Sequence, residues 1–187
     1  MRTFVTIAGV IACTAAVGWA AGDLERRAAE AVAAHRLVEA RGLYRELAAA
    51  DPANSDYRIW VGRLSSWLND YSTAIETFDD VLVTDPGNAE ALVGKAYVAM
   101  WQERFGEAHA LLTEAEAAAP DDTEVQLALA RNHHFQGEDL AARRHVKRAL
   151  ALDPGNAEAQ DLKRRLAPEP QRLGFFAKLK RLITGRS

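Results

Sequence analysis

The sequence predicts an all-α solenoid of four 34-residue helix-turn-helix units followed by a short capping helix. The chain of 187 residues is 49% hydrophobic but only 7% aromatic, and much of its apolar share is alanine, which favours helices. Four prolines recur at a spacing of 34 residues, namely Pro52, Pro86, Pro120 and Pro154. Counting back from these prolines defines units 21–54, 55–88, 89–122 and 123–156, with the cap at 157–166. A period of this length predicts helical hairpins that stack side by side.

Residues 1–22 form the first element, which we interpret as an export signal or a membrane anchor. Arg2 precedes the uncharged residues 3–22, as a charged n-region precedes an apolar h-region. Small residues allow signal-peptidase cleavage after Ala20, but the run also has the roughly 20 residues that a spanning helix needs. A lipoprotein box ending at Cys13 is a third, less favoured alternative. We therefore expect a periplasmic protein or one anchored to the inner membrane.

Within each unit, small residues at the eighth and twentieth positions predict a close crossing of the two helices. These residues are Ala28, Gly62, Ala96 and Ala130 at the eighth position, and Ala40, Ala74, Ala108 and Ala142 at the twentieth. Larger apolar residues at the twenty-fourth position are expected to fill the space between units; they are Tyr44, Phe78, Leu112 and Val146. Two residues after each proline stands a predicted N-cap of the next helix, namely Asn54, Asn88, Asp122 and Asn156.

In its period, its small positions and its turn residues, the segment 21–156 resembles the tetratricopeptide-repeat (TPR) family. The resemblance implies a non-enzymatic scaffold that binds protein partners and needs no cofactor. The end units depart from the family's pattern, with Asp139 at an apolar position of the fourth and Arg27 at one of the first. Such departures are expected of terminal repeats, which lack a neighbour on one side.

The resemblance also implies where a partner binds, because the first helices of TPR proteins line a groove. Ligand contacts in the family come commonly from set positions of these helices, including the ninth, twelfth and thirteenth. The candidates are Arg63, Trp67, Tyr97, Met100, Trp101, Arg131, His134 and Phe135. The Lys and Asn clamp by which chaperone-binding members hold a peptide carboxylate has no counterpart in these helices. A receptor for chaperone tails is therefore not expected.

Aromatic residues occupy the thirteenth position of three consecutive units, as Trp67, Trp101 and Phe135. Either each ring packs into the next unit as core, or the rings form an exposed row that holds a peptide or stacks on sugars. The surrounding strings WLNDYSTA, WQERFGEA and FQGEDLAA are similar to repeats of bacterial envelope proteins that serve polysaccharide secretion and outer-membrane assembly. We expect an envelope scaffold in a secretion, assembly or biofilm complex, with binding of an exported polysaccharide as the alternative.

The tail, residues 167–187, predicts a basic amphipathic helix from about Arg172 to Ile183, after Pro168 and Pro170. Its apolar side consists of Phe175, Phe176, Leu179, Leu182 and Ile183, and its basic side of Lys178, Lys180 and Arg181. These eight residues are candidates for contact with an anionic membrane. Alternatively, the helix folds back over the last repeat, or the tail is disordered and only aids solubility.

Charge and composition exclude several classes of function. Residues 23–166 carry 17 basic and 25 acidic side chains, so this acidic body repels phosphate and is not expected to bind nucleic acid. No catalytic motif is present in the sequence, and a single cysteine allows no disulfide within the chain. Among the histidines, His134 and His145 can meet across one hairpin, but two histidines alone make a poor metal site. We expect no metal.

Overall fold

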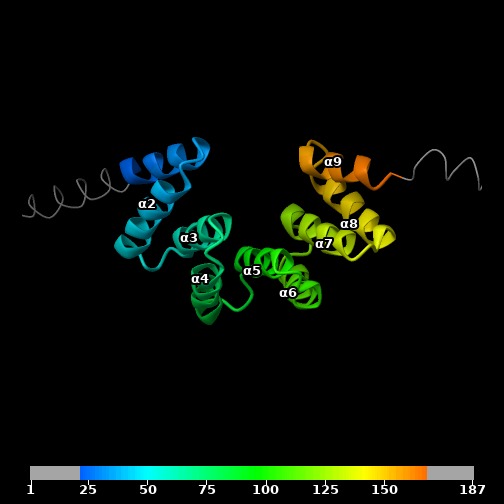
Figure 1. Cartoon of the computed structure of the whole chain (residues 1–187), viewed down its shortest axis with the longest axis horizontal. Helices are drawn as coiled ribbons and strands as arrows, with labels where there is room; N and C mark the ends of the chain where they lie inside the picture. The colour runs from blue at the N-terminus through cyan, green and yellow to red at the C-terminus, as the bar shows by residue number, and fades with distance from the viewer. Residues whose placement is uncertain (1–21, 168–187) are drawn as a thin grey trace, which may run out of the picture. The chain divides into compact units, whose positions relative to one another are not determined.

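The computed structural model describes residues 22–167, and this part of the chain consists of helices joined by turns (Figure 1). It divides into two compact units, the first ending at Ala118 and the second beginning at Ala119. The predicted signal or anchor, up to residue 21, and the predicted tail helix, residues 172–183, lie outside the described residues. Within residues 22–167, no helix is both long and apolar enough to cross a membrane.

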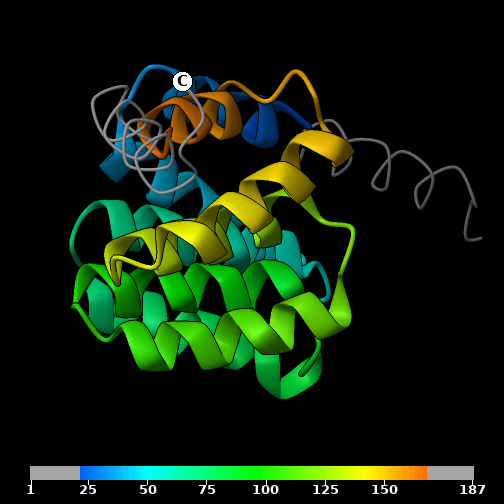
Figure 2. The ribbon, with the colours of Figure 1, turned by 90° about the vertical axis from the view of Figure 1, so that its right-hand side faces the viewer.

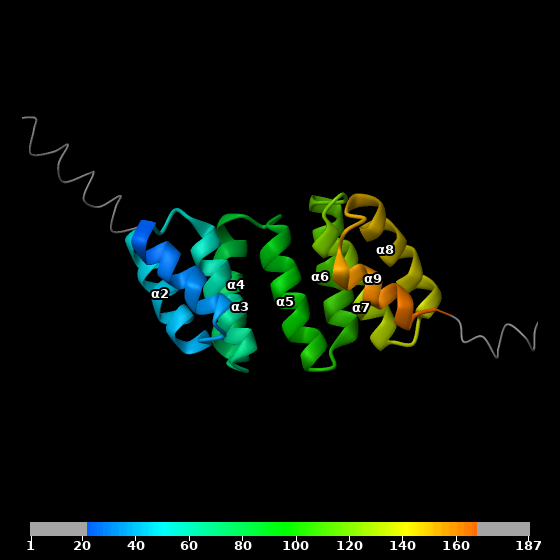
Figure 3. The same cartoon turned by 90° about the horizontal axis from the view of Figure 1, so that it is seen from above.

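The first unit is a series of antiparallel hairpins in which each helix packs on its neighbour in the chain (Figure 3). It contains the helical residues 22–33, α2 (Leu37–Ala50), α3 (Ser55–Trp67), α4 (Tyr71–Thr84), α5 (Ala89–Trp101) and α6 (Phe105–Ala118). Helix α3 also packs on α5, the first helix of the next hairpin. The Tyr57 hydroxyl of α3 donates to Glu25, which raises the pKa of Tyr57 to about 12 and ties residues 22–33 to α3.

As far as residue 167, the second unit contains one complete hairpin and the helix that follows it. Its helices are α7 (Thr123–Phe135), α8 (Asp139–Leu152) and α9 (Ala157–Arg165). Helix α7 packs on α8, and α9, in orange, lies against α8, in yellow (Figure 2). Leu162 of α9 and Leu166, the C-cap of α9, join Val146 of α8 in a buried cluster. One face of α9 therefore packs into the core of this unit, and the rest of the helix is exposed.

The small residues predicted at the helix crossings are all buried, which confirms this part of the sequence analysis. The seven alanines have no exposed surface, and Gly62 is also buried. The larger residues of the twenty-fourth position lie in the core as well, with Phe78 fully buried and Tyr44 7% exposed. The phenyl ring of Phe78 packs against both Gly62 of α3 and Gly94 of α5. One side chain thus joins three helices from two successive hairpins.

The predicted N-caps are also confirmed. Asn54 accepts a hydrogen bond from the N–H of Asp56 at 3.0 Å, and Asn88 accepts one from Ala91 at the same distance. Asp122 and Asn156 cap α7 and α9 in the same way. Each cap satisfies an N–H that has no partner within its helix, and the first helices therefore begin at Ser55, Ala89, Thr123 and Ala157.

The turn inside each hairpin contains one residue in the left-handed region, which the sequence analysis did not predict. These residues recur every 34 positions as His35, Asn69, Glu103 and Gly137, with φ between 54° and 75°. Glycine adopts this conformation without a steric penalty, whereas histidine and glutamate do not. The turns at His35 and Glu103 therefore impose strain that helix packing offsets.

Candidate functional site

The candidate site in the first unit lies at the C-terminal ends of α3 and α5, where Trp67 and Trp101 are both 46% exposed. Neither ring is part of the closed core, so the interpretation that they serve only as internal packing is wrong. In the second unit, Phe135 at the end of α7 is 56% exposed. Each of the three aromatic residues of the thirteenth position therefore exposes part of its ring to solvent within its own unit.

Neighbouring aromatic rings hold both tryptophans in place. Trp101 stacks on Tyr71 and on Tyr97, with centroid distances of 6.2 and 6.1 Å. Trp67 meets Trp60 edge to face at 6.3 Å, and Trp60 stacks on Tyr44 of α2 at 5.2 Å. Because these contacts restrict the exposed rings before binding, a ligand loses little free energy in ordering them. Tyr97, a predicted groove residue, thus supports Trp101.

Arg63 and Arg131, the arginines of the ninth position, make ion pairs between successive first helices. Arg63 of α3 lies 3.1 Å from Glu90 of α5, and its guanidinium lies 5.7 Å from the Trp60 ring centroid. Arg131 of α7 pairs in the same way with Glu158 of α9. Both arginines therefore join repeats as well as line the first-helix face. Sequence reasoning missed this pairing because the partners lie far apart in the chain.

A further ion pair joins the second helices of the first two repeats. Arg41 of α2 donates to Asp70, the N-cap of α4, at 2.8 Å. Hydrogen bonds from Thr73, and then from Arg41, lower the pKa of the Asp70 carboxyl below its ordinary value. Asp70 therefore stays ionised to a lower pH than an ordinary aspartate, and its carboxylate anchors the start of one second helix to the preceding one.

Met100 does not belong to the exposed site, which corrects its prediction as a groove residue. Its side chain is only 4% exposed, and Ser66, at the same position of the preceding repeat, is also buried. The twelfth position of α3 and α5 faces the interior of the first unit. In the second unit, His134 at this position is partly exposed and lies 3.1 Å from Asp139. The remaining candidates are therefore arginines, aromatic residues and this histidine.

The sequence suggested that His134 and His145 meet, but the histidines of the second unit pair differently. His133, rather than His134, stacks on His145, with ring centroids 5.3 Å apart. The Nδ1 atom of His133 lies 2.7 Å from Glu138, and that of His145 lies 2.9 Å from Gln126. Among residues 22–167, no three His, Cys, Asp or Glu side chains gather where they could hold a metal ion.

Antiparallel helix pairs with a period of 34 residues and an exposed face of first helices define a helical-repeat protein of the interaction-scaffold type. A family model described as tetratricopeptide repeat matches residues 31–96, 68–131 and 99–166. The chain belongs to the TPR family. Members of this family generally mediate protein–protein interactions.

Comparisons with solved structures agree on the fold. A thermophilic TPR protein of Thermus thermophilus, TTC0263, aligns with a TM-score of 0.71 and 21% identity over 78% of this chain and 80% of its own. MamA of Desulfovibrio magneticus RS-1 aligns with a TM-score of 0.58 and 19% identity, over 89% of this chain and 97% of its own. The first TPR domain of Spaghetti (RPAP3), bound to the HSP90 peptide SRMEEVD, aligns with a TM-score of 0.57 and 20% identity. This alignment covers 66% of this chain and 96% of that domain.

One similarity in sequence extends to a much larger protein. Over 103 residues the chain is 34% identical to the Protein CTR9 homolog of Arabidopsis thaliana. The match covers 54% of this chain but only 9% of that protein. The likeness thus concerns a small part of a much longer chain.

Proposed function

We propose that this TPR protein is a scaffold of the bacterial cell envelope that holds a protein partner of a secretion, assembly or biofilm complex. The partner binds the exposed side of the first helices, and its main contacts are with Trp67 and Trp101. The observation that carries this proposal is the half-exposed, pre-ordered state of both rings. Large rigid aromatic surfaces of this kind contribute much of the free energy of protein recognition.

The surroundings of the two rings favour a peptide with apolar side chains. The Arg63 guanidinium is already paired with Glu90 and lies over the Trp60 ring, so its charge is largely satisfied within the protein. A ligand therefore gains most by covering the indole faces, at about 25 cal/mol for each Å² of apolar surface removed from water. The exposed edge of Glu90, whose side chain is 58% exposed, adds one acceptor for a donor on the partner.

Replacing Trp101 with alanine is expected to weaken partner binding by about 30-fold, the effect of losing an interfacial anchor worth about 2 kcal/mol. The measurement is chemical cross-linking in intact cells, followed by quantitative mass spectrometry of the captured proteins. Val83→Ala is the matched control, because Val83 is 81% exposed and lies at the C-terminal end of α4, whereas Tyr71, which stacks on Trp101, lies at its start. Equal capture by the wild-type protein and by Trp101→Ala would contradict the proposal.

Binding of an exported polysaccharide is the alternative function, favoured by the same half-exposed rings, since indole faces stack well on sugar rings. A polysaccharide affinity gel distinguishes protein binding from polysaccharide binding. If a protein is the ligand, the wild-type protein passes through the gel without retention. Retention of the wild type that is abolished in Trp101→Ala would instead support the sugar.

The envelope location proposed here is supported by the sequence of the N-terminal segment. Residues 3–22 deliver the repeats to the periplasm or anchor them to the inner membrane, and lipidation at Cys13 is the less favoured route. The cross-linked sample also tests this point, because mass spectrometry shows whether residues 1–20 remain on the mature chain. Recovery of the protein in the cytoplasmic fraction would contradict the proposal.

A further inference from the structure

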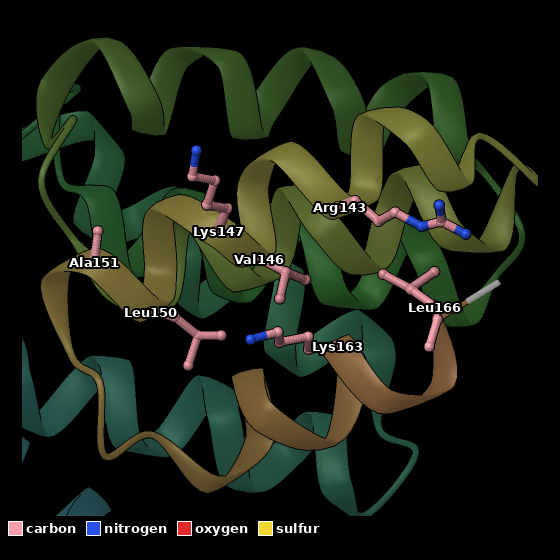
Figure 4. A pocket seen from close by; sticks show the side chains of 8 residues that line it. Arg143, Val146, Lys147, Leu150, Ala151, Lys163 and Leu166 are labelled. Carbon is pink, nitrogen blue, oxygen red and sulfur yellow. The ribbon is translucent and has the colours of Figure 1, made fainter.

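The second unit contains an apolar pocket of about 610 Å³ between α8 and α9 (Figure 4). Val146 and Leu150 point from α8 toward α9, and Leu166 closes the far side. Basic side chains surround this apolar floor; they are Arg143, Lys147 and Lys163. Because Leu150 is only partly buried, the pocket presents apolar surface that a further element can cover.

The position of this pocket corresponds to the second helix of a fifth repeat. Helix α9 starts 34 residues after α7 and is capped by Asn156 as the earlier first helices are capped by their own Asn or Asp. In the first unit, the first helix α3 is followed at once by α4, which packs on it. The described chain ends at Ala167, which itself lines the pocket. The tail therefore begins at the pocket's edge.

The tail has the apolar spacing of an existing second helix. Its apolar residues are Phe175, Phe176, Leu179, Leu182 and Ile183. The residues of α4 that face the core have the same spacing along the chain; they are Ala74, Ile75, Phe78, Val81 and Leu82. Three of these α4 residues are fully buried, and the other two are partly buried against them. A tail helix with this stripe therefore has one face suited to the pocket.

A buried polar atom also indicates that the pocket lacks a partner. Among the described residues, Arg143 Nε is buried without a hydrogen-bond partner. Arg41 occupies the same position of the first repeat and binds Asp70, which precedes the second helix of the next repeat. Glu169 is the sole acidic residue of the tail and follows Leu166 by three residues, a reach of roughly 10 Å in an extended chain. Its carboxylate can therefore pair with Arg143.

We propose that residues 172–183 dock in the α8–α9 pocket as the second helix of a fifth repeat, with Glu169 paired to Arg143. The apolar stripe covers Val146, Leu150 and Leu166, and the basic side of the tail faces water. When the tail is docked in this way, its apolar residues are covered by the pocket and cannot insert into a membrane.

The charges of the pocket give this docking a distinctive salt dependence. Lys147 and Lys163 at the rim repel the basic tail, and salt screens that repulsion. Salt also weakens the Glu169–Arg143 pair, but the apolar contacts that carry the docking do not depend on charge, so docking persists as salt is raised. Binding of the same tail to an anionic bilayer depends on attraction between opposite charges, so it weakens with salt. The two locations are thus distinguished by the effect of salt.

Amide hydrogen exchange of the full chain tests the proposal. In nanodiscs of uncharged phosphatidylcholine, we expect the amides of residues 173–183 to exchange at least about tenfold more slowly than in an unstructured chain. Leu150→Asp should remove this protection, because it places a charge on the apolar floor. Leu140→Asp is the matched control on the same helix, since Leu140 is 74% exposed and does not line the pocket. It should leave the protection unchanged.

A variant in the tail keeps the test valid if Leu150→Asp disturbs the core on which Leu150 packs. Leu179→Asp should expose the tail amides and also speed exchange in α9, while α7 keeps its protection. Unprotected tail amides in the wild type would overturn the proposal. So would protection that appears only in nanodiscs containing anionic phosphatidylglycerol and falls as salt is raised, because the tail would then lie on the membrane.

Discussion

Replacing Phe78 with alanine is expected to lower the free energy of unfolding of the first unit by about 3 to 5 kcal/mol. The ring is fully buried and contacts α3 and α5 from α4, so the cavity would open between two successive hairpins. Chemical denaturation followed by circular dichroism measures the change. Val83→Ala on the same helix is the control, with an expected effect within about 0.5 kcal/mol, because that side chain is exposed. Equal effects of the two variants would show that Phe78 does not join the repeats.

Replacing Gly94 with alanine is expected to destabilise the first unit by about 1 to 3 kcal/mol, although alanine is the better helix former. A Cβ at position 94 would lie 2.4 Å from Phe78 Cζ, and one at position 62 would lie 2.7 Å from Cε1. The ring is held between the two glycines and has no exposed surface, so it has no open space to move into. Overpacking therefore outweighs the gain in helix propensity.

Two comparisons isolate this packing effect in the same denaturation assay. Gly42 lies inside α2, and a Cβ added there would have nothing within 4 Å, so Gly42→Ala should stabilise the protein by about 0.5 to 1 kcal/mol. In a Phe78→Leu background, the cost of Gly94→Ala should shrink or change sign, since the ring that it meets is gone. If Gly94→Ala stabilised the wild-type protein as much as Gly42→Ala does, the close approach of α4 to α5 would be disproved.

The sequence predicts most of the fold because its turn and crossing residues repeat in register. The prolines and the N-caps fix where the first helices begin, and the small residues fix where paired helices cross. Gly94 stands at neither crossing position, and its contact with Phe78 becomes visible only once α4 and α5 are packed together. The left-handed turn residues His35 and Glu103 also escaped prediction, because neither residue type favours that conformation.

The candidate site was less predictable, because which side chains of a repeat are exposed depends on how neighbouring hairpins pack. The spacing of Trp67 and Trp101 placed them at equivalent positions but did not decide between core and surface, and the structure shows both half-exposed. Met100 is one residue before Trp101, and that single step turns its side chain into the core. The link between Arg63 and Glu90 joins two helices from different repeats, which no local spacing reveals.

Photo-cross-linking at single positions tests the central claim, that the side of the first helices carrying the tryptophans holds a protein partner. A photoreactive amino acid replaces Trp101 in one variant and Val83 in another, and both are irradiated in intact cells. We predict a discrete protein adduct from position 101 that is absent or much weaker from position 83. Adducts of equal yield from both positions, or none from position 101, would contradict the claim.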